Sequence, residues 1–513
     1  MTMSIPESFN LATYLVERHV REGRGDRVAL LTATGQTTYA QLDALVNRAG
    51  NALAALGVAP EGRVGLILHD GLAFYAAFLG AIRIGAVPVP INTLLRRNDF
   101  QYILNDSRAR VVIVSAPLAN EVLPITGLLR SLKHLVISGA EAGTLPSFET
   151  LVDAASSSLD PPDTHKDDPA FWLYSSGSTG PPKGTVHLQH DAVYTIEGYA
   201  RGVLGMTERD RCLSAAKLFF AYGLGNSLTF PLGLGAQAVV LPGRPGPDAL
   251  FEAIDRYRPS LFFAVPTLYA AMLQVEAATT RYDLSSLRVC VSAGEALPSE
   301  IFKRWRERFG LEIVDGIGST EMLHIFISNR PGACRPGTSG LEVPGYDAKI
   351  VDDNGLAVPP GTVGTLLVSG DSAAAGYWKQ HEKTKKTFQG DWVNTGDKYV
   401  RDEDGYYRYC GRSDDMLKVG GIWVSPAEVE NTVLAHPAVL ECAVVGATDT
   451  DGLTKPKAFV VLRSGLGATH ETARDIQAFV KANIAPYKYP RWVEIVDEIP
   501  KTATGKIQRF RLR

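Results

Sequence analysis

The sequence predicts an α/β protein with a large N-terminal domain and a small C-terminal domain, and three observations support this. At 513 residues the chain is longer than one hydrophobic core usually supports, so two or more domains are expected. Segments with apolar residues at helical spacing alternate with short β-branched runs, a pattern typical of parallel sheets covered by helices. The pattern then changes near residue 340 and again after Arg412.

The alternation begins with a helix predicted over residues 39–57, where apolar side chains recur at helical spacing and the segment ends at Gly57. A second helix is predicted over residues 74–85. Short apolar runs between such helical segments are predicted as buried strands. They span residues 63–69, 86–91, 109–115, 236–242, 261–266, 287–294 and 311–318.

From about residue 340 the strands become shorter and are separated by glycines, at residues 348–355, 364–370 and 392–412. This predicts antiparallel pairing in a small β-barrel-like part that closes the large domain. After Arg412 a short helix (426–434), two strands (441–447 and 456–462) and an amphipathic helix (471–484) follow. They describe an α+β unit of about a hundred residues, a common size for a domain.

Bulk composition excludes several classes of function. Hydrophobic residues make up 45% and charged residues 21% of the chain, as in globular proteins. A net charge of -3 gives no electrostatic argument for a nucleic-acid partner. The five cysteines are scattered without a CxxC pair, and the N-terminus has no apolar signal-peptide core, so we expect reduced thiols and a cytoplasmic location.

Residues 218–243 carry no charge and are long enough to cross a bilayer. The segment also contains five glycines and Pro231, which would interrupt a membrane helix repeatedly. We therefore expect no membrane association, and interpret the segment as buried strands and turns around a site.

Residues 174–184, YSSGSTGPPKG, form the most informative loop. It follows a strand-like run at 171–174, and its glycines allow backbone N–H groups to converge on an anion. Hydroxyl groups add donors, and Lys183 adds a point charge suited to phosphate. Lys183 precedes Gly184, whereas the common nucleotide loop places a hydroxyl residue after its lysine. The residues alone leave two interpretations, a phosphate-binding loop of another kind or a polar surface loop.

The loop resembles the phosphate loop of the adenylate-forming superfamily, which comprises acyl-CoA synthetases, adenylation domains of peptide synthetases and luciferases. Four more segments resemble the motifs of this superfamily, in the same order. They are GIGSTE (316–321), NTGD (394–397), GRSDDMLKVGG (411–421) and PKTATGK (500–506). The resemblance implies the adenylate-forming enzyme fold. Residues 1–413 would form the N-terminal adenylation domain, and residues 414–513 a mobile C-terminal domain with its hinge near Asp414.

The resemblance implies ATP and Mg²⁺ as ligands. Thr320 would lie near the phosphates, and Glu321 would bind magnesium, a hard cation that takes carboxylate and phosphate oxygens. Asp397 offers a carboxylate to the ribose diol, and Arg412 offers forked donors to the same sugar. Glu295 is equally well read as a solvated charge. The nucleotide-binding residues implied are Ser175, Ser176, Gly177, Ser178, Thr179, Gly180, Lys183, Gly294, Glu295, Ala296, Asp315, Gly316, Ile317, Gly318, Asp397 and Arg412.

Lys506 lies seven residues before the end of the sequence, where a lysine is usually solvated. In the superfamily the equivalent lysine contacts the reacting carboxylate and the α-phosphate, so Lys506 would stabilise charge in the transition state, together with Thr320 and Glu321. The small domain then turns and withdraws this lysine. In this chain the turn would bring Gly420, Gly421 and Trp423 toward the pantetheine of coenzyme A. Core packing is the alternative role for Trp423.

The pocket for the acid would be built beside these motifs. KLFFAYGLGN (217–226) resembles the pocket wall of benzoate-CoA ligases and their hydroxybenzoate relatives. This resemblance makes Phe220 the gating residue and places Ala221, Tyr222, Ile317 and His324 around the acid. Such a wall suits a small flat ring, and it lacks the carboxylate that amino-acid-activating relatives use. His324 could instead be a core histidine.

The leading hypothesis is an aryl-CoA ligase that works through an acyl-adenylate, with benzoate ahead of 4-hydroxybenzoate, 2-aminobenzoate and a fluorobenzoate. Three alternatives stay open: transfer of the acyl group to a carrier protein, luciferase-like oxidation of the adenylate, and nucleotide binding without catalysis. A lysine acyltransferase acting on Lys506 is a candidate partner, because acylation would remove the charge of that lysine. A monomer or a homodimer is expected.

Overall fold

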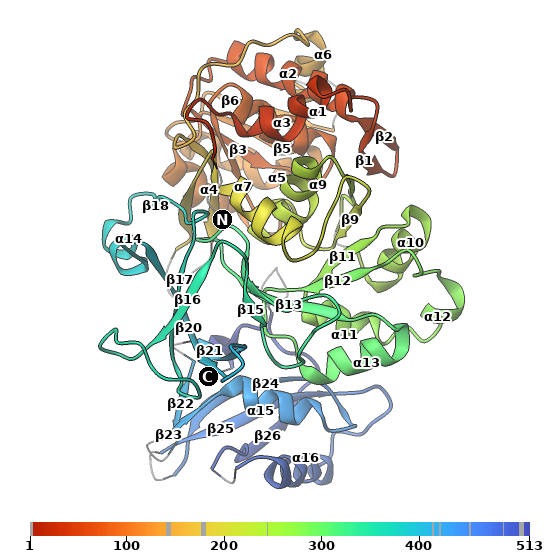
Figure 1. Cartoon of the computed structure of the whole chain (residues 1–513), viewed down its shortest axis with the longest axis vertical. Coiled ribbons are helices and arrows are strands. Elements are labelled where there is room, and N and C mark those ends of the chain that lie inside the picture. Colours follow the sequence, from red (N-terminus) through yellow and green to blue (C-terminus); the bar gives the residue numbers. More distant parts are fainter. Residues whose placement is uncertain are drawn as a thin grey trace.

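The computed structural model describes residues 4–139, 145–175, 181–243, 245–412, 415–419, 422–450, 453–485, 487–501 and 507–512, and at 418, 422 and 423 the backbone alone. Parallel sheets covered by helices make up most of the first 330 residues, and an α+β unit follows residue 415 (Figure 1). The predicted α/β class is therefore confirmed. The division of the chain at 413/414 stays a prediction, because both residues lie outside the described part.

Two sheets form the body of the large domain. The order of the larger sheet is β15 (Leu341–Glu342), β14 (Ile325–Ser328), β13 (Ile313–Gly318), β12 (Val289–Ser292), β11 (Leu261–Ala264), β9 (Arg211–Ser214), β10 (Gln237–Val239), β1 (Val28–Thr32) and β2 (Gly35–Thr38). The larger sheet has parallel strands at its centre, and its outer strands pair antiparallel: β14 with β13 and β15 at one edge, and β2 with β1 at the other. The smaller sheet is parallel, in the order β4 (Val87–Pro90), β3 (Arg63–Ile67), β5 (Val111–Ser115) and β6 (His134–Ser138).

The helices begin and end where local sequence favours it. Helix α2 (Tyr39–Ala55) starts after Thr38, whose hydroxyl and the Gln41 side chain form a capping box. Helix α3 (Leu72–Arg83) is buried along almost its whole length and packs against α2. Helix α10 (Pro247–Tyr257) has proline at its first position, and α13 (Ser299–Phe309) ends at Gly310 in the left-handed region.

The strands predicted after residue 340 are antiparallel, as expected. β16 (Asp347–Val351), β17 (Gly364–Ser369), β20 (Trp392–Arg401) and β21 (Tyr407–Arg412) pair in sequence, and β19 (Phe388–Gln389) pairs with β20. A separate small sheet joins β7 (Pro169–Ser175), β8 (Lys183–Leu188) and β18 (Gly376–Tyr377). Its strands β7 and β8 flank the predicted phosphate loop.

The C-terminal unit has its own hydrophobic core, built mainly from valines, and all of its residues follow residue 416. In Figure 1 it is the blue unit at one end of the long axis. Helix α15 of this unit packs against β21 and α13 of the large domain. Its elements are β22 (Leu417–Val419), β23 (Ile422–Val424), α15 (Pro426–Leu434), β24 (Val439–Thr448), β25 (Thr454–Leu462), α16 (His470–Asn483) and β26 (Trp492–Ile495).

Residues 218–243 differ from the expectation of buried strands and turns. The segment is buried but largely helical: α8 (Ala221–Leu224), a π-helical turn η5 (Gly225–Thr229) and α9 (Phe230–Leu234) precede β10. The glycines there allow close packing rather than breaking the helix, since a Cβ at Gly225 would meet the His324 ring at 2.3 Å. Among the described residues no helix combines the length and the apolar character needed to cross a membrane.

Candidate active site

The phosphate loop joins two antiparallel strands. In the β7–β8 hairpin Ser175 lies opposite Lys183, so these residues close the strand pair on either side of the loop. The loop follows strand β7, which contains the strand-like run predicted at 171–174. β7 belongs to the small antiparallel sheet, because the chain returns directly along β8. The predicted phosphate contacts Ser176, Gly177, Ser178, Thr179 and Gly180 lie outside the described residues.

Lys183 contacts the predicted magnesium ligand through a tyrosine. Its Nζ donates to the Tyr377 hydroxyl at 3.1 Å and lies 3.9 Å from Oε1 of Glu321. The Tyr377 hydroxyl donates to the same Oε1 at 2.6 Å. Burial lowers the pKa of Lys183, while the charge of Glu321 opposes that shift. Lys183 and Glu321, which the sequence motifs assign to one triphosphate, thus lie close in space although 138 positions separate them in the chain.

A buried histidine holds the backbone of the Thr320–Glu321 motif. His187 of β8 is fully buried, with Nε2 2.8 Å from the Thr320 carbonyl and Nδ1 2.8 Å from an Asp191 carboxylate oxygen. The Glu321 carbonyl accepts from Ala374 N–H at 2.8 Å. Leu323 follows with φ 64°, a backbone conformation that a branched residue rarely adopts. The segment is therefore fixed on both sides before any ligand binds.

The adenine motifs lie at the carboxyl ends of neighbouring parallel strands. Ser292, the last residue of β12, is the register partner of Asp315 in β13, so the segment 294–296 begins beside Asp315. Gly294 has φ +95°, which suits glycine. At Gly318, where β13 ends, a Cβ would meet the His324 carbonyl at 2.5 Å, so the close return of the chain requires glycine. Burial raises the pKa of Asp315 to about 8.

The predicted ribose contacts are paired directly. Asp397 of β20 is the register partner of Arg412 in β21, and Nη1 of Arg412 lies 3.1 Å from Oδ1 of Asp397. The same guanidinium nitrogen donates to the Thr395 carbonyl at 3.1 Å. Burial lowers the pKa of Lys183 most, and the charges of Lys383 and Arg412 lower it further.

The predicted acid pocket has a wall of tilted and edge-on aromatic rings. The ring centroid of His324 lies 5.5 Å from that of Tyr222 and 4.4 Å from that of Phe230. Nε2 of His324 lies 3.1 Å from Oδ1 of Asn226, whose amide nitrogen donates to Ser214. That geometry places the proton on Nε2. Burial lowers the pKa of His324 to about 3, so the ring is neutral at physiological pH.

The other predicted pocket residues lie around this wall. Phe220 has extended backbone before α8, and its ring is edge-on to Phe219 with centroids 4.5 Å apart. Ala221 begins α8, and Ile317 of β13 packs, like Ala221 and Tyr222, against the main hydrophobic core. The Tyr222 hydroxyl lies 3.2 Å from the Val291 carbonyl, which leaves its ring rather than its hydroxyl for the pocket.

One hydrogen bond links the end of the chain to the adenine motif. Ile507 N–H donates to the Glu295 carboxylate at 2.9 Å. The sequence left open whether Glu295 is a binding residue or a solvated charge. In the structure its carboxylate contacts the residue that follows Lys506. Lys506, Asp414, Gly420 and Gly421 lie outside the described residues, as does the Trp423 side chain.

Sequence reasoning missed several polar side chains that contact predicted site residues within the described part of the chain. Tyr377 bridges Lys183 and Glu321, His187 bonds to Thr320, and Asn226 bonds to His324. No spacing indicated them, because each contact joins segments 56 to 194 positions apart. Asn226 lies in η5, directly after α8, in a segment that the sequence predicted as strands and turns.

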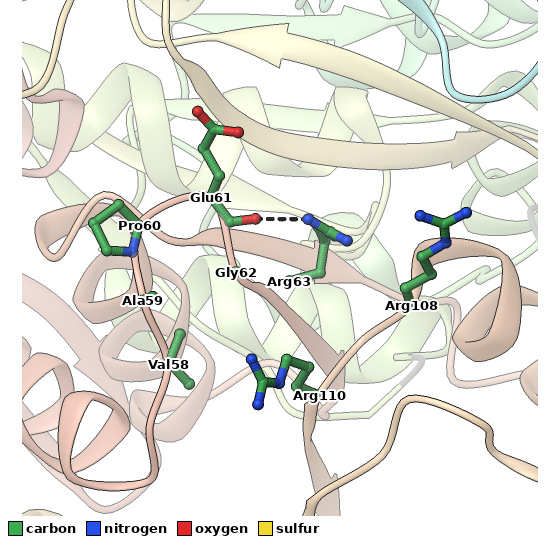
Figure 2. A pocket seen from close by; sticks show the side chains of 8 residues that line it. All are labelled: Val58, Ala59, Pro60, Glu61, Gly62, Arg63, Arg108 and Arg110. Carbon is green, nitrogen blue, oxygen red and sulfur yellow. Dashed lines mark hydrogen bonds between the residues drawn. The ribbon is translucent and has the colours of Figure 1, made fainter.

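A cavity of about 240 Å³ lies away from these residues, at the amino ends of β3 and β5 (Figure 2). Arg63, Arg108 and Arg110 line it with the turn 58–62. Figure 2 shows their guanidinium groups pointing in different directions, and that of Arg63 bonds to the Glu61 carbonyl at 2.9 Å. None of the predicted site residues that the structure describes lines this cavity.

Comparison with known proteins agrees with the motif order. Residues 16–378 match the model of the AMP-binding enzyme family, and residues 428–506 match that of the AMP-binding enzyme C-terminal domain. The chain is 52% identical to a benzoate–CoA ligase of Thauera aromatica, over 100% of this chain and 97% of that protein. It is 47% identical to the 4-hydroxybenzoate–CoA/benzoate–CoA ligase of Rhodopseudomonas palustris, over 98% of this chain and 94% of that protein.

A solved structure is similar over nearly the whole length. The crystal structure of an anthranilate CoA ligase in complex with anthranoyl-AMP superimposes with a TM-score of 0.96 and 45% identity, covering 99% of this chain and 97% of that one. The similarity extends across both matched family regions.

Proposed function

We propose the following reaction for this chain, which belongs to the AMP-binding enzyme family. It is an acid–thiol ligase that joins a small aromatic carboxylic acid to coenzyme A and converts ATP to AMP and pyrophosphate through an acyl-adenylate. Benzoate is the proposed acid, ahead of 4-hydroxybenzoate and 2-aminobenzoate. The similar ligases act on acids of this class, and the benzoate–CoA ligase is 52% identical.

The observation that carries this proposal is the uncharged ring wall of Tyr222 and His324. The His324 ring is neutral and tilted by 37° from the Tyr222 ring, so the wall offers flat surface and no charge. A substrate ammonium group would find no countercharge on these two side chains, whereas a benzoate ring can stack on them. His324 follows Glu321 by three residues, which supports an acid site near the phosphates.

In the first half-reaction a carboxylate oxygen of the acid attacks the α-phosphorus of ATP. The bond from this phosphorus to the bridging oxygen breaks, and pyrophosphate leaves with the electron pair. Lys183 and the loop hydroxyls Ser175, Ser176, Ser178 and Thr179 would hold the β- and γ-phosphates, with backbone N–H groups of Gly177 and Gly180. Lys506 would contact the reacting carboxylate and the α-phosphate. Catalysis then rests on positioning and charge.

The residues present fit a magnesium ion. Oε1 of Glu321 is engaged by Tyr377, while Oε2 has no hydrogen bond or ion pair within the described part of the chain. One carboxylate oxygen together with phosphate oxygens is a donor set that Mg²⁺ commonly takes. When bound there, the ion would supply positive charge beside the triphosphate. Thr320, next to Glu321, would contact the phosphates.

Asp397 and Arg412 would bind the ribose, and residues 294–296 with Asp315–Gly318 would surround the adenine. The paired strands β12 and β13 support this assignment, because they bring the two adenine segments side by side. The close pairing of Asp397 with Arg412 supports a shared contact to one diol.

In the second half-reaction the thiolate of coenzyme A attacks the carbonyl carbon of the adenylate, and AMP leaves with the electron pair. We assign the hinge to Asp414 and the pantetheine contacts to Gly420, Gly421 and Trp423. The bond between Ile507 and Glu295 supports the view that the described arrangement serves the first half-reaction, because it draws the segment after Lys506 to the adenine motif.

Three further assignments complete the proposal. A lysine acyltransferase would inhibit the first half-reaction by neutralising Lys506. The five free thiols agree with a cytoplasmic location. We propose a monomer or a homodimer in solution.

Pyrophosphate release tests the proposal. The purified chain is assayed with ATP and magnesium across a panel of aryl, alkyl and amino acids, with and without coenzyme A. Continuous turnover with benzoates that requires coenzyme A is the expected result. A single burst unaffected by coenzyme A would indicate a carrier-protein acceptor, and turnover with alkyl acids in preference to benzoates would overturn the aromatic assignment.

A further inference from the structure

Tyr377 is held firmly at the centre of the Lys183–Glu321 contact. It ends β18, where it is the register partner of Thr185 in β8. Its N–H donates to the Thr384 hydroxyl at 3.0 Å, and its ring packs edge-on against Phe388 with centroids 5.4 Å apart. The Nζ of Lys183 also lies 4.2 Å from the ring centroid. The hydroxyl is therefore presented by a fixed ring.

The direction of the hydrogen bonds follows from the groups involved. The Tyr377 hydroxyl has one proton, and the ammonium of Lys183 can only donate. The tyrosine proton thus goes to Oε1 of Glu321 at 2.6 Å, and the tyrosine oxygen accepts from Lys183 at 3.1 Å. The short distance is typical of a hydrogen bond to a charged acceptor. The Tyr377 hydroxyl thus bonds to Oε1, which is also the Glu321 oxygen nearest to the Lys183 ammonium at 3.9 Å.

We propose that Tyr377 is a positioning residue that fixes the rotation of the Glu321 carboxylate and keeps Oε2 available to the metal of the metal–nucleotide complex. This inference rests on the proposed function, because it takes Glu321 as the metal ligand. It adds a residue outside the five sequence motifs. In this arrangement Tyr377 bonds to Oε1 of Glu321, and Oε2 is left for the metal ion.

The arrangement also links the two ligand-binding charges. While Lys183 shares the tyrosine oxygen, it lies beside Glu321 and the two charges offset each other. When Lys183 turns to the phosphates, the Tyr377 hydroxyl still donates to Oε1, so the carboxylate keeps its orientation. Loss of the hydroxyl alone should therefore weaken metal–nucleotide binding more than it weakens folding.

The test is Tyr377→Phe, which keeps the ring, its packing on Phe388 and its contact with Lys183. The matched control is Tyr407→Phe, which removes another tyrosine–glutamate hydrogen bond, 2.8 Å long, from Tyr407 to Glu342. Binding of Mn²⁺ with a non-hydrolysable ATP analogue is measured by electron paramagnetic resonance, without any acid. KM for magnesium–ATP and for benzoate, kcat and the Tm of both variants are measured alongside.

For Tyr377→Phe we expect Mn²⁺ to bind about 10- to 100-fold more weakly in the presence of the analogue, the effect of one hydrogen bond to a charged group. KM for magnesium–ATP should rise, KM for benzoate should stay unchanged, and Tyr407→Phe should leave Mn²⁺ binding unaltered. Equal Mn²⁺ binding by wild type and Tyr377→Phe would overturn the inference. An equal loss of Mn²⁺ binding in Tyr377→Phe and Tyr407→Phe would also overturn it. A wild-type chain that binds no Mn²⁺–nucleotide would instead refute the proposed function itself.

Discussion

Asp315 is a buried carboxyl group at the predicted adenine site, and burial raises its pKa from 3.8 to about 8. The folded protein therefore keeps this proton between about pH 4 and pH 8, whereas the unfolded chain releases it. The stability that the group contributes is complete below pH 4 and is lost as the pH rises toward 8. At neutral pH Asp315 is a neutral acid, with one donor and one acceptor for a base edge.

Asp315→Asn should remove this pH dependence, because an amide offers both a donor and an acceptor without the titration. As the pH rises from 5 to 8, wild type should lose stability and the variant should not. The free energy of unfolding of the variant should therefore increase relative to that of wild type, by up to about 1.4 kcal/mol for each pH unit. Denaturant titrations at several pH values measure it, together with ATP binding at pH 7, which should stay close to wild type. Parallel pH profiles of the two proteins would contradict the assignment.

Ala221 tests the proposed pocket wall at the level of one small side chain. Ala221→Leu adds volume at the start of α8, and overpacking of this kind costs about 1–3 kcal/mol, or roughly 10- to 100-fold in kcat/KM. We expect substituted benzoates to lose more turnover than benzoate itself. Ala54→Leu, on the exposed face of α2, is the matched control. An unchanged ranking of acids would place Ala221 outside the pocket.

At the scale of elements, the segment that carries Lys506 is anchored on both flanks. Before it, Lys501 donates to both Glu441 oxygens at 2.6 and 2.7 Å. After it, Arg509 of the 3₁₀ helix η6 (Arg509–Arg511) makes a forked contact to Glu430 at 2.9 Å. Burial raises the pKa of the Glu430 carboxyl, and the charge of Arg509 partly offsets that increase. Cross-strand contact of Lys501 with Ile507 closes the base of the segment.

Arg509→Met should release this anchor while the rest of the domain stays folded. Breaking a buried ion pair costs about 3–5 kcal/mol, because the remaining charge is buried without its partner. We expect slower adenylation and faster hydrogen exchange in residues 507–512, whereas Arg511→Met, at an exposed position two residues away, should change neither. Adenylation at the wild-type rate would show that the forked contact does not position Lys506.

At the scale of the whole molecule, we expect that one substitution can abolish the first half-reaction and leave the second intact. Lys506→Ala is expected to abolish pyrophosphate release from acid and ATP, because the charge that contacts the reacting carboxylate is lost. Thioester formation from preformed benzoyl-adenylate should continue, since the proposed mechanism withdraws Lys506 before that step. The second assay is the control for folding. Equal loss of both activities would refute the division of labour between the two arrangements.

Much of this architecture could be predicted from the sequence. Alternating helical and β-branched patterns predicted strands β3, β4, β5, β12 and β13 within a few residues, because each pattern is local. Residues 218–243 were predicted as strands and turns, since the helical turns there depend on packing of Gly225 against His324. His187 and Tyr377 escaped prediction for the same reason: their partners are set by which strands become neighbours.

The turn that carries the phosphate loop has an electrostatic consequence. A loop that enters a helix places the positive end of the helix dipole beneath a bound phosphate, but this loop ends in strand β8, which has no such dipole. A countercharge next to the loop is instead the ammonium of Lys183, at the start of β8. Because burial already lowers the pKa of this lysine, the attraction for phosphate should fade at a less alkaline pH than an exposed lysine would allow.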